Sequence, residues 1–115
     1  MATLAEVRKR ALIKLGVGNR HQSPTANQDS DMSNAYTELY LKLQEMDQAY
    51  WGQTSAVPDE VANEVSLLMA LSRADDYGIS NERYQRLILG APSAYITIRS
   101  MAVNPHRSVD EPEDF

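Results

Sequence analysis

The chain has 115 residues, 43% of them hydrophobic and 23% charged, a composition that predicts one folded domain and not a disordered chain. It contains no cysteine, which excludes disulfides and thiolate metal sites. We expect no signal peptide, because the start of the chain, MATLAEVRKRAL, is charged. We expect no membrane span, because the apolar runs are too short. The net charge of -5 combines a basic first twenty residues, with five bases against one acid, and an acidic end, DEPEDF, an asymmetry that suits head-to-tail contacts between copies.

The first predicted helix begins after Thr3, because Thr3 and Glu6 have the spacing of a capping box. Apolar residues then recur at intervals of three and four and form one helical stripe: Leu4, Val7, Ala11 and Leu15. Gly16 or Gly18 can adopt the left-handed conformation that ends such a helix.

A basic cluster lies off this stripe and contains Lys9, Arg10 and Lys14, with Ile13 among them. An isoleucine surrounded by basic side chains can mark a contact surface. We therefore treat Lys9, Arg10 and Lys14 as a candidate channel-lining or inter-subunit face. The alternative is a solvated helix face, which is the usual role of such charge runs.

The segment GVGNRHQSPTANQD, which follows, contains glycine, basic and small polar residues, as a phosphate-binding loop does. A Walker loop needs a glycine followed by Lys and then Ser or Thr, and a dinucleotide fingerprint needs a third glycine and a preceding strand. This segment has neither pattern and follows a helix. We therefore predict a connector between helices, with no nucleotide or other cofactor.

The second predicted helix starts near Asp29 or Ser30, and Tyr40 flanks its apolar face, which consists of Met32, Ala35, Tyr36, Leu39, Leu43 and Met46. The helix fades in the loop sequence AYWGQTSAVP, where Tyr50 and Trp51 lie. Aromatic side chains at a helix end either close the end of a core or anchor a protein interface. Tyr50 and Trp51 are therefore candidate interface residues, with a core role as the alternative.

A third helix is predicted from Pro58, whose ring suits the first helical position, to a stop at residues 77–78. Its apolar face contains Val61, Val65, Leu68, Met69 and Ser72. Ser80 then caps a fourth helix, whose apolar residues stay in phase across Gly90 and Pro92: Tyr84, Leu87, Ile88, Ala91, Tyr95, Ile98 and Met101. The preserved phase favours one long, kinked helix over two short ones.

The sequence thus predicts an all-α protein, a small four-helix bundle in residues 1–103 with a long last helix. Residues 104–115 are polar, acidic and proline-containing, so we expect an extended tail without structure of its own. The histidines, His21 and His106, are far apart and lack the spacing of metal ligands.

Carboxylates offer the remaining route to catalysis. Glu60 and Glu64 share a helix face and Asp75 lies further on, but a hydrolase would need these groups in a pocket with perturbed pKa values, whereas exposed pairs are commonly solvated. We expect no enzyme and no metal. The acidic overall balance also argues against sequence-specific DNA binding and leaves non-specific proximity to DNA.

Six segments follow one another in a characteristic order: ALIKLGV, QSPTANQD, NAYTELYLKLQEM, VPDEVANEVSLLMALSRADDYGI, ERYQRL and AYITIRSMAVNP. Their order and distances, over residues 4–105, resemble those of the head-to-tail connector proteins of tailed bacteriophages, the small head-completion or tail accessory adaptors. The interruption at residues 90–92 departs from this family pattern and leaves the orientation of the portal-facing end open.

The resemblance implies a ring, commonly of twelve subunits, that docks beneath the portal protein, extends the DNA channel and offers its lower face to a downstream tail or nozzle protein. It implies a structural protein of the virion neck, assembled in the host cytoplasm, without a membrane partner. In such proteins the C-terminal segment often grips the portal. Here that role would fall on the tail candidates Asn104, Pro105, His106, Arg107, Val109 and Phe115.

The alternative from the residues alone is a small helical protein-binding or regulatory module of a phage or bacterium. Such a module would be monomeric or dimeric and would bind its partner in the groove between the second and fourth helices.

Overall fold

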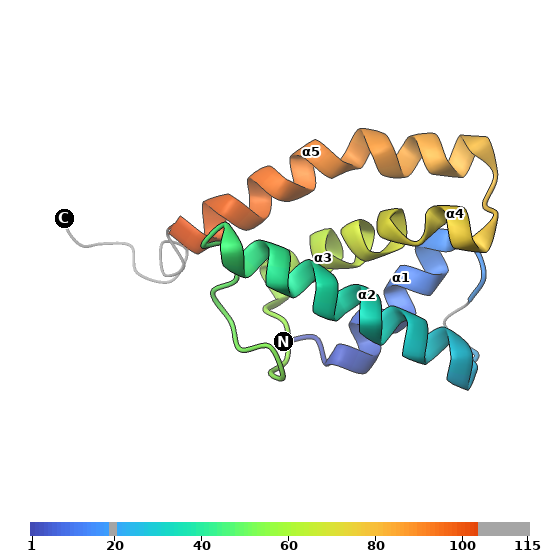
Figure 1. Cartoon of the computed structure of the whole chain (residues 1–115), viewed down its shortest axis with the longest axis horizontal. Helices are drawn as coiled ribbons and strands as arrows, with labels where there is room; N and C mark the ends of the chain where they lie inside the picture. Colours follow the sequence, from blue (N-terminus) through green and yellow to red (C-terminus); the bar gives the residue numbers. More distant parts are fainter. Residues whose placement is uncertain (19–20, 104–115) are drawn as a thin grey trace.

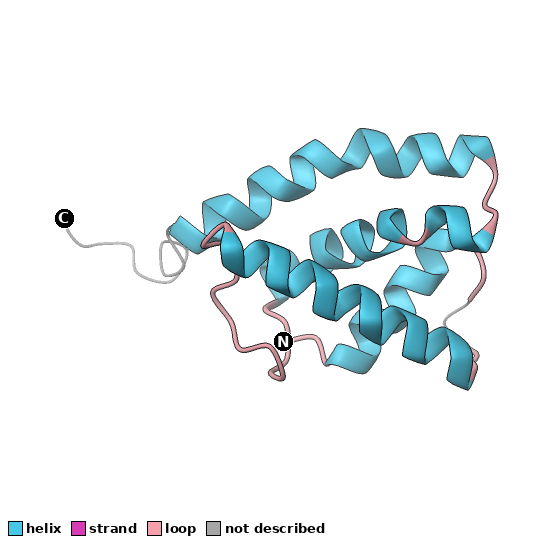
Figure 2. Ribbon diagram, viewed as in Figure 1, coloured by secondary structure: helices cyan, strands magenta, loops and turns pink. Residues whose placement is uncertain are grey.

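The computed structural model describes residues 1–18 and 21–103, and in this part the chain is all-α, as predicted. The helices are α1 (Leu4–Leu15), α2 (Ala26–Glu45), α3 (Asp59–Ser72), the one-turn α4 (Ala74–Tyr77) and α5 (Asn81–Val103). They form an elongated body, and α5 runs along its whole length (Figure 1). Figure 2 shows helices joined by short loops, with one longer loop between α2 and α3.

Helix α3 is the centre of the fold, because it packs against α1, α2, α4 and α5. Its inward-facing residues Val61, Val65 and Met69 are completely buried. They belong to one core with buried residues of the other long helices: Val7, Leu12, Leu15, Met32, Leu43 and Ile98. Small residues allow the close approach. Ser66 is buried, and its hydroxyl donates a hydrogen bond to the Ala62 carbonyl. Gly90 lies so close to α3 that a Cβ there would be 2.8 Å from the Leu67 Cδ1.

The N-terminus is fixed to the loop before α3. Ala2 and Val57 exchange two backbone hydrogen bonds, of 2.9 and 2.8 Å, in an isolated antiparallel bridge. Both residues are buried. The predicted capping box of α1 is confirmed, with Thr3 and Glu6 bonded reciprocally, and Gly16 ends the helix at φ 81°.

The predicted start of α2 is wrong by one turn. The helix begins at Ala26, because Thr25 and Gln28 form a second capping box that satisfies backbone donors of the first turn. The other end differs too: Met46, assigned to the core stripe, is exposed where the helix ends. The rest of the predicted α2 face is buried, including Tyr40.

The third predicted helix is in fact two. Pro58 is the N-cap of α3 and not its first residue. Helix α3 ends at Ser72, and Arg73 separates it from α4. The Arg73 guanidinium reaches α2, where it forms two hydrogen bonds with the Glu38 carboxylate, of 3.2 and 3.3 Å, and an ion pair with Asp31 at 3.1 Å. The predicted stop at Gly78 is confirmed, at φ 57°.

The last predicted helix is continuous through Pro92, and Figure 1 shows its axis bending near the middle. Leu87, Ala94 and Ile98 are buried, so the core face keeps its phase across the proline, although Ile88 is exposed. Ser80 caps the helix by accepting the Arg83 backbone N–H.

Arg83 has a second role, since its guanidinium donates to the Lys14 carbonyl at the end of α1, at 3.2 Å. It lies against Gly16, where a Cβ would be 2.9 Å from the guanidinium carbon. A cation is favourable at a helix C-terminus, where carbonyls are left unpaired. This contact joins the start of α5 to the end of α1.

We expect Gly16→Ala to destabilise the protein more than Gly78→Ala. Both glycines have positive φ, which costs an alanine about 1–2 kcal/mol, but only Gly16 has Arg83 packed against it, whereas nothing lies within 4 Å of a Cβ at Gly78. Displacing Arg83 should add about 1 kcal/mol. Chemical denaturation of both variants measures the difference, and equal losses would contradict a role for the Arg83 contact.

Candidate interaction surfaces

The three basic candidates on α1 do not form one face. Lys9 and Lys14 lie five positions apart, about 140° around the helix. Lys14 turns toward α3, where its Nζ donates to the Asn63 Oδ1 at 2.8 Å, whereas Lys9 lines a groove beside the α1–α2 connector. Arg10 is exposed between these directions. The three basic side chains thus point in different directions, and Arg10 presents its charge to solvent. Their role at a channel or between subunits stays a prediction.

Lys14 and Arg8 are engaged within the subunit. Partial burial lowers the pKa of the Lys14 ammonium, and the nearby Glu64 carboxylate acts in the opposite direction. Arg8 Nε donates to the Asp29 Oδ1 at 2.7 Å and so connects α1 to the first turn of α2. These two cations bind neighbouring helices of the same chain.

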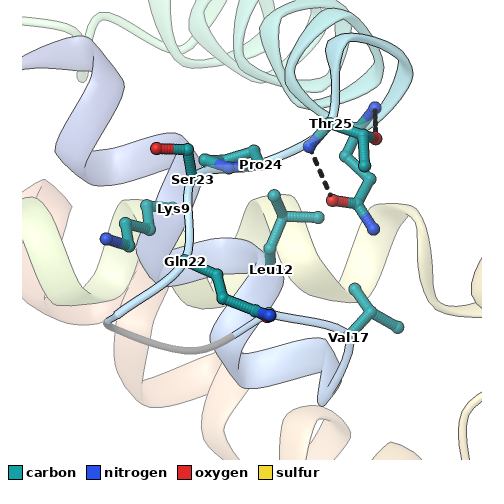
Figure 3. Close-up of a pocket in the computed structure, with 9 residues that line it drawn as sticks. Lys9, Leu12, Val17, Gln22, Ser23, Pro24 and Thr25 are labelled. Carbon is teal, nitrogen blue, oxygen red and sulfur yellow. Dashed lines mark hydrogen bonds between the residues drawn. The ribbon is translucent and has the colours of Figure 1, made fainter.

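The groove beside the connector has a volume of about 370 Å³ and is lined by residues of α1, the connector and the first turn of α2 (Figure 3). Leu12 and Val17 form its apolar side, and Ser23, Pro24 and Thr25 run along the other. The Thr25 backbone N–H is bonded to the Gln28 side chain, and the Gln28 N–H to the Thr25 hydroxyl. These donors at the start of α2 are used by the helix's own cap, as fits a connector and not a phosphate loop.

Trp51 belongs to the core, and its assignment as an interface residue is wrong for the folded subunit. It is 7% exposed, and its indole N–H donates to the Tyr36 hydroxyl at 2.8 Å. The Tyr40 hydroxyl donates to the Trp51 carbonyl, and the Tyr40 and Tyr50 rings meet the indole edge to face. The aromatic residues therefore close the end of the core between α2 and the loop, the alternative that the sequence left open.

Tyr50 lies at the edge of this cluster and is half-buried. Its hydroxyl donates to the Glu60 Oε2 at 3.0 Å. Burial, and then the hydrogen bond with Glu60, raise the pKa of Tyr50 well above its ordinary value. Glu60, one of the carboxylates considered for catalysis, is thus paired with a tyrosine on the protein surface.

We expect Trp51→Ala to lower the free energy of unfolding by about 3–5 kcal/mol, the usual loss for a buried tryptophan, and Tyr36→Phe to lower it by about 1–2 kcal/mol by leaving the indole N–H unpaired. Denaturant titration measures both. Because Trp51 is the only tryptophan, its fluorescence reports its environment directly. Red-shifted emission from the native protein, typical of an exposed indole, would contradict the buried position.

The other acidic residues form no metal site in the described ranges. Residues 1–18 and 21–103 contain no group of three or more His, Cys, Asp or Glu side chains arranged to hold a metal ion. Asp75 lines a shallow depression beside Gly78 and Ile79, and Glu64 lies near Lys14. In the same ranges no helix is long and apolar enough to cross a membrane.

Tyr77 is a titratable group that the sequence did not single out. Burial raises the pKa of the Tyr77 hydroxyl to about 12, and its hydrogen bond to Asp31 acts in the same direction. Asp31 also pairs with Arg73, whose pKa is raised by its hydrogen bonds to Glu38. Asp31 thus connects α2 to the residue between α3 and α4 and to the end of α4.

These shifts predict a loss of stability at alkaline pH. Between pH 10 and 12 an unfolded tyrosine releases its proton, whereas Tyr77 in the folded chain keeps it, so the unfolded state is increasingly favoured as pH rises. Denaturation at a series of pH values should show stability falling over this interval, and Tyr77→Phe should flatten the decline. An identical decline in Tyr77→Phe would contradict the assignment.

A groove of about 170 Å³ lies between α2, α3 and α5, where the alternative function would bind a partner. Leu39 and Leu68 contribute to its lining. Lys42 and Tyr95 approach each other across its edge, with the Lys42 Nζ 3.2 Å from the Tyr95 hydroxyl and 5.4 Å from the ring centre. The groove is thus small and partly closed by this contact.

The outer face of α5 carries an apolar stripe that the sequence analysis missed. Leu89, Ile96 and Val103 are 77%, 56% and 70% exposed, and they recur at intervals of seven residues. Seven-residue intervals return a side chain to nearly the same face of a helix every two turns. In the sequence this stripe is obscured by the stronger apolar pattern on the face of the same helix that packs on α3.

The tail candidates Asn104, Pro105, His106, Arg107, Val109 and Phe115 lie outside the described residues. No family model, curated protein or solved structure matches this chain.

Proposed function

We propose that this chain is a structural head-to-tail adaptor of a tailed-bacteriophage virion, one subunit of a ring beneath the portal that extends the DNA channel and offers a platform to tail components. The proposal begins from the sequence resemblance over residues 4–105. The structural observation that supports it best is the course of α5, whose C-terminal end lies at one end of the body formed by the described helices (Figure 1). The last described helix therefore ends at one end of the molecule, where a neighbouring protein can approach it.

The distribution of charge supports the same proposal. The last six residues carry four acids and no base. At the other end of the sequence Arg10 is exposed on α1, while Arg8 and Lys14 are engaged inside the subunit. Opposite charges on two parts of one subunit suit a heterologous contact, which is the kind that closes into a ring. Arg10 is the residue that we propose to face a neighbouring copy or the DNA.

We further propose that the role is not enzymatic. The carboxylates that the sequence offered for a hydrolase lie in different surroundings, Glu60 beside Tyr50, Glu64 near Lys14 and Asp75 at the α4 turn. They do not converge on one pocket, whereas general acid–base catalysis needs its groups within reach of one substrate. A binding role in the virion neck needs only surfaces.

Deleting residues 105–115 is expected to abolish or strongly weaken binding to the portal ring encoded by the same phage genome. The described helices end at Val103, so the truncated chain should keep its helical content, which circular dichroism checks. The measurement is co-sedimentation with purified portal rings. A chain with the same tail residues in scrambled order is the matched control and should bind weakly too.

The two parts of the proposal have different contradicting outcomes. If the truncated chain binds as tightly as the full chain, the tail does not grip the portal. If the full chain itself does not bind the portal ring, the adaptor function is wrong.

The second candidate function is a small helical protein-binding or regulatory module. The groove between α2, α3 and α5 favours it, because Leu39 and Leu68 would receive an apolar side chain of a partner. Measuring the mass of the chain with and without a portal ring separates the two functions, since a module has no affinity for the ring.

A further inference from the structure

We propose that helix α5 can be exchanged between two copies of the chain, so that the α5 of each copy packs on the α3 of the other, and that the backbone at Gly78 sets the balance between the closed chain and the exchanged pair. The exchange of one element between identical chains is a low-cost way to form a dimer. It needs no new interface, because α5 keeps the contacts that it makes within the single chain. The inference goes beyond the proposed function and concerns the chain without a portal.

The surface that α5 occupies is complementary to α5 itself. Helix α5 packs mainly on α3 and buries Leu87, Ala94 and Ile98. The fit is close, since a Cβ at Gly90 would lie only 2.8 Å from the Leu67 Cδ1. Two chains that release α5 recover the burial of these apolar side chains only by covering α3 with a helix of the same shape. The structure therefore identifies the occupant as the α5 of a second copy.

The polar contacts of α5 can be formed in the same way between copies. The Arg83 guanidinium donates to the Lys14 carbonyl at the end of α1, and the Lys42 Nζ on α2 lies 3.2 Å from the Tyr95 hydroxyl. In the exchanged pair α1, α2 and α3 of one copy stay together and offer the same partners to the incoming helix. Exchange therefore leaves none of these groups without a partner.

The hinge of the exchange is the segment 78–80, between the end of α4 and the start of α5. Gly78 has φ 57°, in the left-handed region, and the chain turns there so that α5 runs back along α3 (Figure 1). Gly78 is exposed, and nothing lies within 4 Å of a Cβ placed on it. In the exchanged pair the segment must lead away to the other copy, and the open surroundings of Gly78 let its backbone change without repacking the core.

A side chain at position 78 should therefore favour the exchanged pair. The left-handed conformation is unfavourable for an L residue and disfavours the closed chain by roughly tenfold. A hinge that leads to the other copy does not need this conformation, and each dimer relieves two hinges. We expect Gly78→Ala to strengthen association of the chain about tenfold or more.

Sedimentation equilibrium of the full chain, refolded at a series of concentrations, measures this association. The matched control is Gly16→Ala, because Gly16 also has a positive φ, of 81°, but lies at the end of α1, in the part that stays together. Its substitution strains the closed chain and the exchanged pair equally, so association should stay at the level of the wild-type chain. Circular dichroism verifies that both variants fold.

Disulfide trapping identifies the contact, since the chain has no native cysteine. Leu67→Cys and Gly90→Cys are introduced into separate Gly78→Ala chains, which are mixed in denaturant, refolded together and oxidised. Exchange brings position 67 of one chain against position 90 of the other and should give a covalent dimer of the two different chains. Leu67→Cys mixed with Leu41→Cys, on the exposed side of α2, is the control for random collision.

Three results would each overturn the inference. Gly78→Ala associates no more strongly than the wild-type chain, or Gly16→Ala strengthens association equally, or the Gly78→Ala dimer forms without the disulfide between positions 67 and 90. None of these measurements involves a portal. The failure of the exchange is therefore distinguishable from the failure of the adaptor function.

Discussion

The fold depends on the burial of α3 by helices on several sides. Val61, Val65 and Met69 have no contact with solvent, and Ala62, Ser66 and Ala70 between them are buried too. A helix surrounded in this way must alternate large and small side chains, because neighbouring backbones can approach only where side chains are short. Helices α1, α2 and α5 each contribute one apolar stripe to it, and the other faces of these helices remain outside.

Contacts at the helix ends fix how these layers are arranged. Arg83 connects the start of α5 to the last carbonyls of α1, and Arg73 connects the α3–α4 junction to α2. The Ala2–Val57 bridge fixes the N-terminus to the loop before α3. Each is a polar contact between segments far apart in sequence. The Arg83 contact and the Ala2–Val57 bridge also satisfy backbone groups that a helix end or chain end leaves unpaired. The burial of apolar side chains drives the helices to pack, and these polar contacts determine how the helices are aligned.

The sequence predicted the helices well where one signal dominated. Neighbouring residues determine local backbone geometry. The sequence therefore predicts the capping box at Thr3, the glycine stops and the apolar stripes of α1, α2 and α5. It predicted badly where tertiary contacts decide. Nothing near Arg73 in the sequence marks a helix break, and the break is accompanied there by ion pairs with α2. The start of α2 is decided locally by the Thr25–Gln28 box, but Asp29 and Ser30 are also good cap residues, so the sequence offers competing starts one turn apart.

The candidate surfaces show the same limit more strongly. Counting charges in α1 could not show that Lys14 turns toward Asn63 while Lys9 turns toward the connector. An aromatic pair at a helix end is compatible with core or interface, and only the Tyr36 and Tyr40 partners of Trp51 decide for the core. The stripe on α5 was predictable in principle from its spacing. The buried residues of the core face dominate the apolar pattern of this helix and obscure its second, exposed stripe.

The one-sided attachment of α5 has a dynamic consequence. Its 23 residues are held mainly by α3, whereas α3 is held by all its neighbours. An outermost layer of this kind is the natural unit of partial opening, in which one helix detaches while the remainder stays native. Amide protons should then exchange with solvent faster along α5 than along α3, and a ligand that covers α5 would slow that exchange without reshaping the rest.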